Sequence, residues 1–176
     1  MAYLESERFY YTELCEDDVT EKYVEWMNDI DVSRFLESDV EQYTLSIIKN
    51  YVREIKNKAN VYLFGIYDKN KNEHIGNVKI NCSSEYHKRG DIGIIVGDKN
   101  YWGQGVATES VRTITAFGFR EMGLYRITAG CNSVNVGSIK VFEKAGYSVE
   151  GVIRKDNVFN GGRVDGILLG VLCDEI

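Results

Sequence analysis

The residues most able to do chemistry lie in the segment from Asp98 to Glu109, DKNYWGQGVATE. A predicted strand ends just before this segment, and a long predicted helix begins near Gly105. Glycine has no Cβ, so Gly103 and Gly105 let the backbone approach a ligand closely. The unpaired N–H groups of the first helical turn face outward beside the positive end of the helix dipole. The segment therefore predicts a site for a diphosphate group, which the small side chains of Ala107 and Thr108 keep open.

Two common phosphate-binding patterns do not match this loop. A Walker loop ends in Gly-Lys-Ser/Thr, which the chain lacks. A dinucleotide-binding fingerprint needs a third glycine inside a parallel βαβ unit, but Ser110 occupies that position and the preceding strands are predicted to be hairpins. The alternative without a ligand is a glycine turn that only starts a helix.

Metal-ligating residues are scattered along the chain. The two histidines, His74 and His87, have no partner at metal-ligand spacing, and the four cysteines form no C-x-x-C pair. We therefore expect no metal site.

The composition favours one globular domain over residues 1–176, with 44% hydrophobic and 27% charged residues. Asp and Glu total 27 against 21 Lys and Arg, which gives a formal charge of −6. An acidic surface repels phosphate backbones, so we expect no nucleic-acid partner, whereas an amine would suit this charge. No signal peptide is visible, and no apolar run reaches the ~18 residues that a membrane span needs. These features predict a cytoplasmic protein without membrane association.

Hydrophobic periodicity predicts the order β-α-α-β-β-β-α-β-α-β-β. The predicted strands cover residues 8–14, 61–67, 75–82, 89–97, 125–131, 147–153 and 163–172, and the predicted helices cover residues 16–28, 40–58, 105–122 and 134–145. One mainly antiparallel sheet with helices on both faces packs this order economically, which indicates the α/β (α+β) class.

Three blocks of sequence resemble the RimJ/RimL-type branch of the GNAT N-acetyltransferases. The loop Trp102–Ala107, WGQGVA, is similar to the acetyl-CoA loop Q/R-x-x-G-x-G/A, with Trp102 in place of the usual Gln or Arg. Asn135–Tyr147 resembles the N-x-x-S…EKxGF segment of that branch, and His87–Gly93 resembles the strand before the loop. The resemblance implies the GNAT fold: a central, mostly antiparallel, seven-stranded mixed sheet with a splayed strand pair and about four flanking helices.

The resemblance also implies acetyl-CoA as cosubstrate, without a metal. Backbone amides of the strand before the loop would hold the thioester, at Ile94, Ile95 and Val96. The diphosphate would rest on the loop and the first helical turn, at Trp102, Gly103, Gln104, Gly105, Val106, Ala107 and Thr108. Asn135 would contact the pantetheine arm, with Ser138 and Phe142 on the same segment.

Acetyl transfer to an amine needs a group that protonates or stabilises the leaving thiolate. Many relatives use a tyrosine at the position of Phe142, which cannot donate a proton. Ser138 matches a serine that the resemblance places near the sulfur, and it is the candidate acid. The alternative is a serine on the helix surface that bonds the backbone.

The amine must also lose a proton before it attacks. Some relatives place a glutamate where this chain has Gly130, so that route is absent. Asp91 matches a carboxylate position of other members, and Glu85 and His87 are neighbouring alternatives. A salt bridge of Asp91 on the strand edge, or a water chain that relays the proton, remains open.

The acceptor is the least determined part of the reaction. Five residues fall where the first two helices meet, a region that borders the acceptor pocket in the family: Trp26, Asn28, Asp29, Asp31 and Arg34. We predict a small amine or amino sugar, with a protein or peptide N-terminus as the alternative. A polyamine is a further alternative that fits the acidic charge, although Asp29, Asp31 and Glu37 are too few and too local to establish one. A CoA-binding sensor without catalysis and a structural interaction module also stay open, and a homodimer is possible because dimers are common in this family.

Overall fold

The computed structural model describes residues 3–36 and 41–176, which divide into two compact units. The described residues of Met1–Lys79 and Ile94–Val106 form the first unit, and Ile80–Gly93 and Ala107–Ile176 form the second. Strands β4 and β5 contribute residues to both units. The expectation of a single domain over residues 1–176 stays a prediction.

The strands hydrogen-bond in the order β1-β2-β3-β4-β5-β6-β8-β7. They are β1 (Tyr3–Glu5), β2 (Phe9–Glu13), β3 (Val61–Asp68), β4 (Glu73–Ser84), β5 (Arg89–Val96), β6 (Arg126–Asn132), β7 (Ser148–Phe159) and β8 (Gly162–Leu172). The pairs β1–β2, β2–β3, β6–β8 and β7–β8 are antiparallel, whereas β5–β6 is parallel. The predicted α/β class with a mostly antiparallel mixed sheet is confirmed.

The described part of the chain has eight strands where seven were predicted, and the additional one is β1. Its three residues pair with β2 in the register Tyr3↔Thr12 to Glu5↔Tyr10. The ring of Tyr3 stacks on Tyr10 across this pair, and Tyr10 stacks on Tyr67 of β3 with centroids 4.9 Å apart. Cross-strand aromatic contacts of this kind stabilise a strand that is too short to show periodicity in the sequence.

The first unit contains three α-helices, namely α1 (Glu21–Asn28), α2 (Ile30–Ser33) and α3 (Leu45–Lys56), and the short 3₁₀ helices η1 (Glu16–Asp18) and η2 (Lys99–Tyr101). The helix predicted over residues 16–28 is divided, because the Thr20 side chain accepts from the Tyr23 N–H and caps α1. The helix predicted over residues 40–58 begins only after Thr44, whose side chain accepts from the Ile47 N–H.

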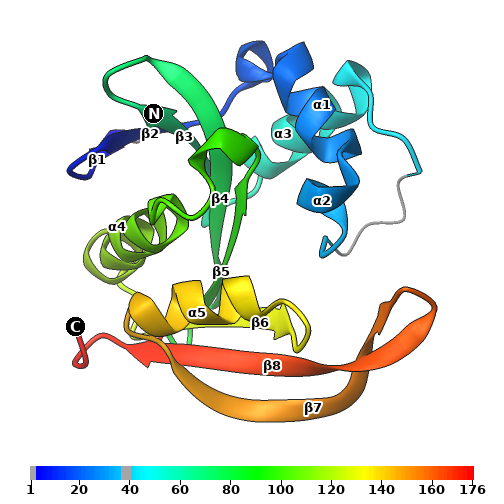
Figure 1. Ribbon diagram of the computed structural model, residues 1–176. Helices are drawn as coiled ribbons and strands as arrows, with labels where there is room; N and C mark the ends of the chain where they lie inside the picture. The colour runs from blue at the N-terminus through cyan, green and yellow to red at the C-terminus, as the bar shows by residue number, and fades with distance from the viewer. Residues whose placement is uncertain (1–2, 37–40) are drawn as a thin grey trace. The chain divides into compact units, whose positions relative to one another are not determined.

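The core of the first unit lies between these helices and β3. Helix α3 buries Ile48, Val52 and Ile55, which recur at helical spacing on one face. Tyr23 and Trp26 of α1 belong to the same buried cluster. In Figure 1 these helices are blue to cyan.

The second unit contains α4 (Val106–Arg120, apart from its first residue) and α5 (Val136–Lys144) with the remaining strands. Gly118 lets α4 approach closely, because a Cβ there would meet Ile80 Cδ1 at 2.6 Å and Ile127 Cδ1 at 2.7 Å. The hydroxyls of Thr115 and Tyr147 form a buried hydrogen bond of 2.7 Å. Figure 1 shows the long, curved β7–β8 hairpin in orange and red, near α5.

Candidate functional site

The loop between β5 and α4 adopts the turn that its glycines predict. Asp98 caps η2 by accepting from the Asn100 N–H at 3.0 Å, and Tyr101 at its end is buried. Gly103 and Gly105 then have φ values of 73° and 78°, in the left-handed region that favours glycine. Helix α4 begins directly afterwards.

The surface over this turn is open to a ligand. A Cβ on Gly103 would meet no atom of the described chain within 4 Å, and a Cβ on Gly105 would meet only Arg8 Nη2, at 3.5 Å. The Trp102 indole donates to the Val96 carbonyl at 2.8 Å, and the Gln104 amide donates to a backbone carbonyl at 2.5 Å. Both side chains are thus engaged by backbone carbonyls of nearby residues, Val96 and Asn100. Main-chain amides are the donor type that suits a diphosphate.

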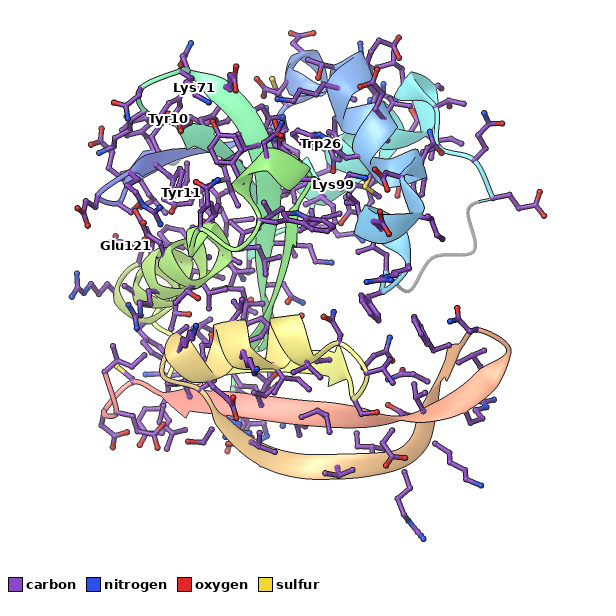
Figure 2. The ribbon with its side chains drawn as sticks, in the orientation of Figure 1. Tyr10, Tyr11, Trp26, Lys71, Lys99 and Glu121 are labelled. Carbon is purple, nitrogen blue, oxygen red and sulfur yellow. The ribbon has the colours of Figure 1, made fainter. Side chains whose placement is uncertain are left out.

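Ion pairs anchor the start of the loop to the helices of the first unit. Lys22 Nζ lies 2.8 Å from Asp98 and over the ring of Trp26, whereas Lys99 Nζ lies 2.5 Å from Asp29. The hydrogen bond from Lys99 holds the pKa of Asp29 below its usual range. Figure 2 labels Trp26 of α1, over which Lys22 lies, and Lys99 of η2.

The strand before the loop lies tightly against β4. Ile94, Ile95 and Val96 are half-buried. A Cβ on Gly76 of β4 would lie 2.4 Å from the Ile95 carbonyl oxygen, so only glycine allows this approach of the two backbones. This packing defines the position of the strand that is predicted to face the thioester.

Strands β5 and β6 pair in parallel over only three residues. The register runs from Arg89↔Arg126 to Asp91↔Thr128, and no further pairing joins these fully described strands, although β6 continues to Asn132. The end of this pairing at Asp91 agrees with the prediction of a splayed pair, which itself stays a prediction. Asp91 is half-buried at the last paired position.

The two alternative bases occupy a different environment. Glu85 and His87 lie in the exposed turn between β4 and β5. The His87 ring contacts the edge of Tyr86, which is 91% exposed. Among the three candidates, only Asp91 lies on a strand of the sheet.

Asn135 and Ser138 meet at the start of α5. The Asn135 side chain caps the helix by accepting from the Ser138 N–H at 3.1 Å. The Ser138 hydroxyl lies 3.2 Å from Cys131 Sγ on β6. Burial raises the pKa of the Cys131 thiol, so the thiol stays protonated near neutral pH and can exchange a hydrogen bond with Ser138.

Phe142 and Asn132 of the second unit differ in their environments. Phe142 is 2% exposed and contacts the edge of Tyr147 at 5.2 Å, so it packs in the interior. Asn132 Oδ1, at the end of β6, is buried and has no hydrogen-bond partner among the described residues. A donor on a ligand would satisfy this acceptor.

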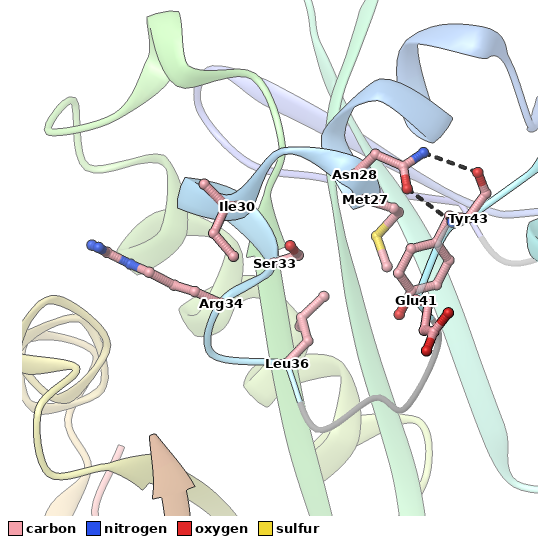
Figure 3. Close-up of a pocket in the computed structure, with 8 residues that line it drawn as sticks. All are labelled: Met27, Asn28, Ile30, Ser33, Arg34, Leu36, Glu41 and Tyr43. Carbon is pink, nitrogen blue, oxygen red and sulfur yellow. Dashed lines mark hydrogen bonds between the residues drawn. The ribbon is translucent and has the colours of Figure 1, made fainter. Parts of the chain in front are cut away.

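A pocket of about 310 Å³ lies at the junction of α1 and α2. It is lined by Met27, Asn28, Ile30, Ser33, Arg34, Leu36, Glu41 and Tyr43. Two hydrogen bonds join the Asn28 side chain to the Tyr43 backbone, and Figure 3 shows Arg34 extending to the side opposite Tyr43. The sequence pointed to Asn28 and Arg34 here, whereas Glu37 lies outside the described residues.

The sequence did not point to Arg8 or Cys131. Arg8 Nη1 donates to the Gln104 carbonyl at 2.9 Å although 96 positions separate the two residues. For Cys131 the sequence indicated only a thiol that packs in the interior, because its partner Ser138 lies on the next helix. No local pattern could have found either contact.

Two absences apply to the described ranges. These residues contain no group of three or more His, Cys, Asp or Glu side chains that could hold a metal ion. They also contain no helix with the length and apolar character needed to cross a membrane.

The chain matches the family model described as an acetyltransferase (GNAT) domain over residues 8–148. It is 36% identical over 116 residues to "Probable N-acetyltransferase YjcK" of Bacillus subtilis, a match that covers 65% of this chain and 64% of the relative. The chain spans just under two thirds of the length of this relative and of an uncharacterized N-acetyltransferase of Bacillus licheniformis, 64% and 62% respectively.

Solved structures resemble the chain over nearly its full length. A GNAT-family acetyltransferase from Bacillus anthracis is 25% identical, has a TM-score of 0.86, and is matched over 99% of this chain and 100% of that one. A spermidine N-acetyltransferase from Vibrio cholerae, in complex with CoA and spermine, is 15% identical, with a TM-score of 0.86 and coverage of 97% and 98%. The second likeness concerns the fold alone. With a family model that covers most of its length, the chain belongs to the GNAT acetyltransferase family.

Proposed function

We propose that the chain is an acetyl-CoA-dependent N-acetyltransferase that transfers the acetyl group directly to a primary amine, in the first place a small-molecule amine or amino sugar. The observation that carries the proposal is the open turn at Gly103 and Gly105, with its left-handed backbone and the helix start behind it. Main-chain amides at such a turn suit the diphosphate of a nucleotide cofactor.

The amides of Ile94, Ile95 and Val96 would hold the acyl group in this proposal. Acetyl-CoA supplies an activated acetyl thioester when it is bound. The end of pairing between β5 and β6 after Asp91 supports this role, because a strand without a continuous partner has backbone groups that can bind a ligand. The buried acceptor Asn132 Oδ1, together with Asn135, would bind donors of the pantetheine arm.

Ser138 would donate a hydrogen bond to the leaving thiolate and pass it a proton, which the serine regains from water. The Asn135 cap holds its backbone, and Cys131 holds its hydroxyl. A protonated thiol that donates to the Ser138 oxygen would direct the serine proton away from itself and toward another acceptor. Phe142 packs in the interior and cannot supply a proton, which leaves the serine as the candidate acid on this helix.

Asp91 would take or relay the proton of the acceptor amine, which has a pKa of ~10 as a free alkylammonium. Its half-buried place beside the end of the β5–β6 pairing supports this role. Glu85 and His87 are the alternatives, and their exposed turn favours a relay through water.

The pocket between α1 and α2 would take the acceptor. Its volume of about 310 Å³ suits a small molecule, and its lining carries one carboxylate, Glu41, and one guanidinium, Arg34. Asp29 and Asp31 both contact Lys99 of the loop. Because these acids anchor the loop, they are poorly suited to bind a polyamine, and this observation favours a small polar amine.

An acetylation panel tests the proposed function. The chain is incubated with acetyl-CoA and separately with amino sugars, small amines, polyamines and peptides, and mass spectrometry detects acetylated products. We expect product from a small amine or amino sugar. The Gly105→Val variant should lose CoA affinity in calorimetry, because its side chain would lie over the turn in a strained backbone conformation.

The alternatives give different results in the same panel. Acetylated peptide alone would indicate an N-terminal acetyltransferase. CoA binding without any product would indicate a sensor. Absence of CoA binding by the wild-type chain would contradict the proposal, and normal CoA binding by Gly105→Val would contradict the assignment of the turn.

A further inference from the structure

Lys99 is the cation that the loop itself contributes, and it forms ion pairs with two carboxylates. The charged residues of the segment from Asp98 to Gly105 are Asp98 and Lys99. Lys99 Nζ is held between Asp29 at 2.5 Å and Asp31 at 3.4 Å. In a protein with a net charge of −6, a local positive charge at this turn would strengthen the binding of an anionic diphosphate.

Arg8 brings such a charge to the loop from the other end of the sequence. It directly precedes β2, and its Nη1 donates to the Gln104 carbonyl at 2.9 Å. Its Nη2 lies 3.5 Å from the position of a Cβ on Gly105. The guanidinium is thus located at the carbonyl between the two left-handed glycines.

The arginine side chain is held in this place by contacts at the start of β2 and at the end of β3. Its guanidinium carbon lies 4.9 Å from the centroid of the Phe9 ring, which is 2% exposed. The Arg8 carbonyl accepts from the Lys69 N–H at 3.1 Å, so its backbone is tied to the end of β3. The contact with the buried Phe9 ring and the hydrogen bond of the Arg8 carbonyl together keep the exposed guanidinium at the loop.

We propose that Arg8 is a cationic ligand of the cofactor's diphosphate, an inference that rests on the proposed function of the loop. A planar guanidinium has five N–H donors, so it can hold the Gln104 carbonyl and a phosphate oxygen together. The main-chain amides of the turn are neutral donors, and a guanidinium adds a full positive charge to the hydrogen bonds that the phosphate accepts. The site therefore combines amides from the loop with one charge from the start of β2.

Calorimetry with three probes tests the proposal on the full chain. CoA carries the diphosphate and the 3′-phosphate, dephospho-CoA keeps only the diphosphate, and pantetheine has neither. Arg8→Met should weaken CoA and dephospho-CoA by about tenfold to a hundredfold and leave pantetheine unchanged. Arg8→Lys should lose less, because it keeps the charge. Added salt should weaken CoA binding less in Arg8→Met than in the wild type, because the variant lacks the screened charge.

Lys69→Met is the matched control. Lys69 is a nearby cation whose Nζ contacts Glu5 at 2.8 Å rather than the loop. This variant removes one positive charge from the same region, so its CoA affinity should stay within about twofold of the wild type, as expected for a charge screened by solvent.

Each other result has a defined meaning. Equal losses for CoA and pantetheine would show that Arg8 only braces the loop, and a loss for CoA but not dephospho-CoA would move it to the 3′-phosphate; both overturn the proposal. Unchanged CoA affinity in Arg8→Met overturns it while the loop assignment stands, whereas a wild-type chain that binds no CoA refutes the proposed function itself. If Arg8→Met fails to fold, Arg8→Lys and the wild-type salt dependence decide.

Discussion

Replacement of Gly97 by alanine should destabilise the first unit because the residue packs directly against a buried ring. A Cβ on Gly97 would lie 2.1 Å from Cδ2 and 2.3 Å from Cε3 of Trp26. Carbon atoms in ordinary contact are ~3.5–4.0 Å apart, so the overlap exceeds ~1 Å. Trp26 is 6% exposed and contacts Tyr23 and His74, which leaves its ring little room to move.

Overpacking of this kind costs about 1–3 kcal/mol, and the short distances place Gly97→Ala near the upper value. For a chain of this length, 3 kcal/mol corresponds to a fall in Tm of about 6–12 °C. The variant should also bind CoA more weakly, because Gly97 and Asp98 both donate to the Ile75 carbonyl immediately before the loop. Displacement of the Trp26 ring would shift these two hydrogen bonds and the start of the loop with them.

Urea unfolding followed by tryptophan fluorescence measures the effect, since Trp26 is one of two tryptophans. Gly93→Ala on β5 is the control, because a Cβ there would meet nothing within 4 Å in the described chain. It should leave stability unchanged or raise it by up to about 1 kcal/mol. Equal unfolding midpoints for the two variants would refute the packing argument.

Two further predictions concern the acid candidate and a buried histidine. Ser138→Ala should lower kcat about a hundredfold or more while the CoA affinity stays within about twofold, and unchanged turnover with the true acceptor would remove Ser138 from the reaction. Burial lowers the pKa of His74 below its usual 6.5, so the unfolded chain binds that proton more tightly and stability falls as the pH drops below ~6.5. His74→Gln should flatten the pH dependence of the unfolding free energy between pH 7 and 5, measured by urea titration, and an unaltered slope would contradict this cause.

Periodicity predicted most elements to within a few residues. In strands such as β3 and β8, the apolar residues form a continuous or alternating pattern that becomes buried in the sheet. The sequence alone missed β1, whose three residues depend on stacking against Tyr10, and it missed the break before α1, where the Thr20 cap interrupts an otherwise continuous helical pattern. In both cases a few specific contacts outweighed the average pattern.

The candidate site was predictable only in part. Gly103 and Gly105 pointed to the loop because a left-handed turn needs glycine, and their φ values agree. The hydrogen bond between Ser138 and Cys131 was not predictable, since the spacing of seven residues crosses from a strand to a helix. The orphaned acceptor of Asn132 likewise depends on burial, which no local sequence pattern specifies.

The sequence by itself determined the glycine turn, the helix that follows it and the absence of a lysine at the end of the loop. Those features depend on local backbone preferences, which act over a few residues. Only the tertiary structure decided that Arg8 lies at Gln104 and that Asp29 and Asp31 hold Lys99. Such contacts depend on how the strands and helices of the unit pack, because side chains distant in sequence meet only after their elements are in place.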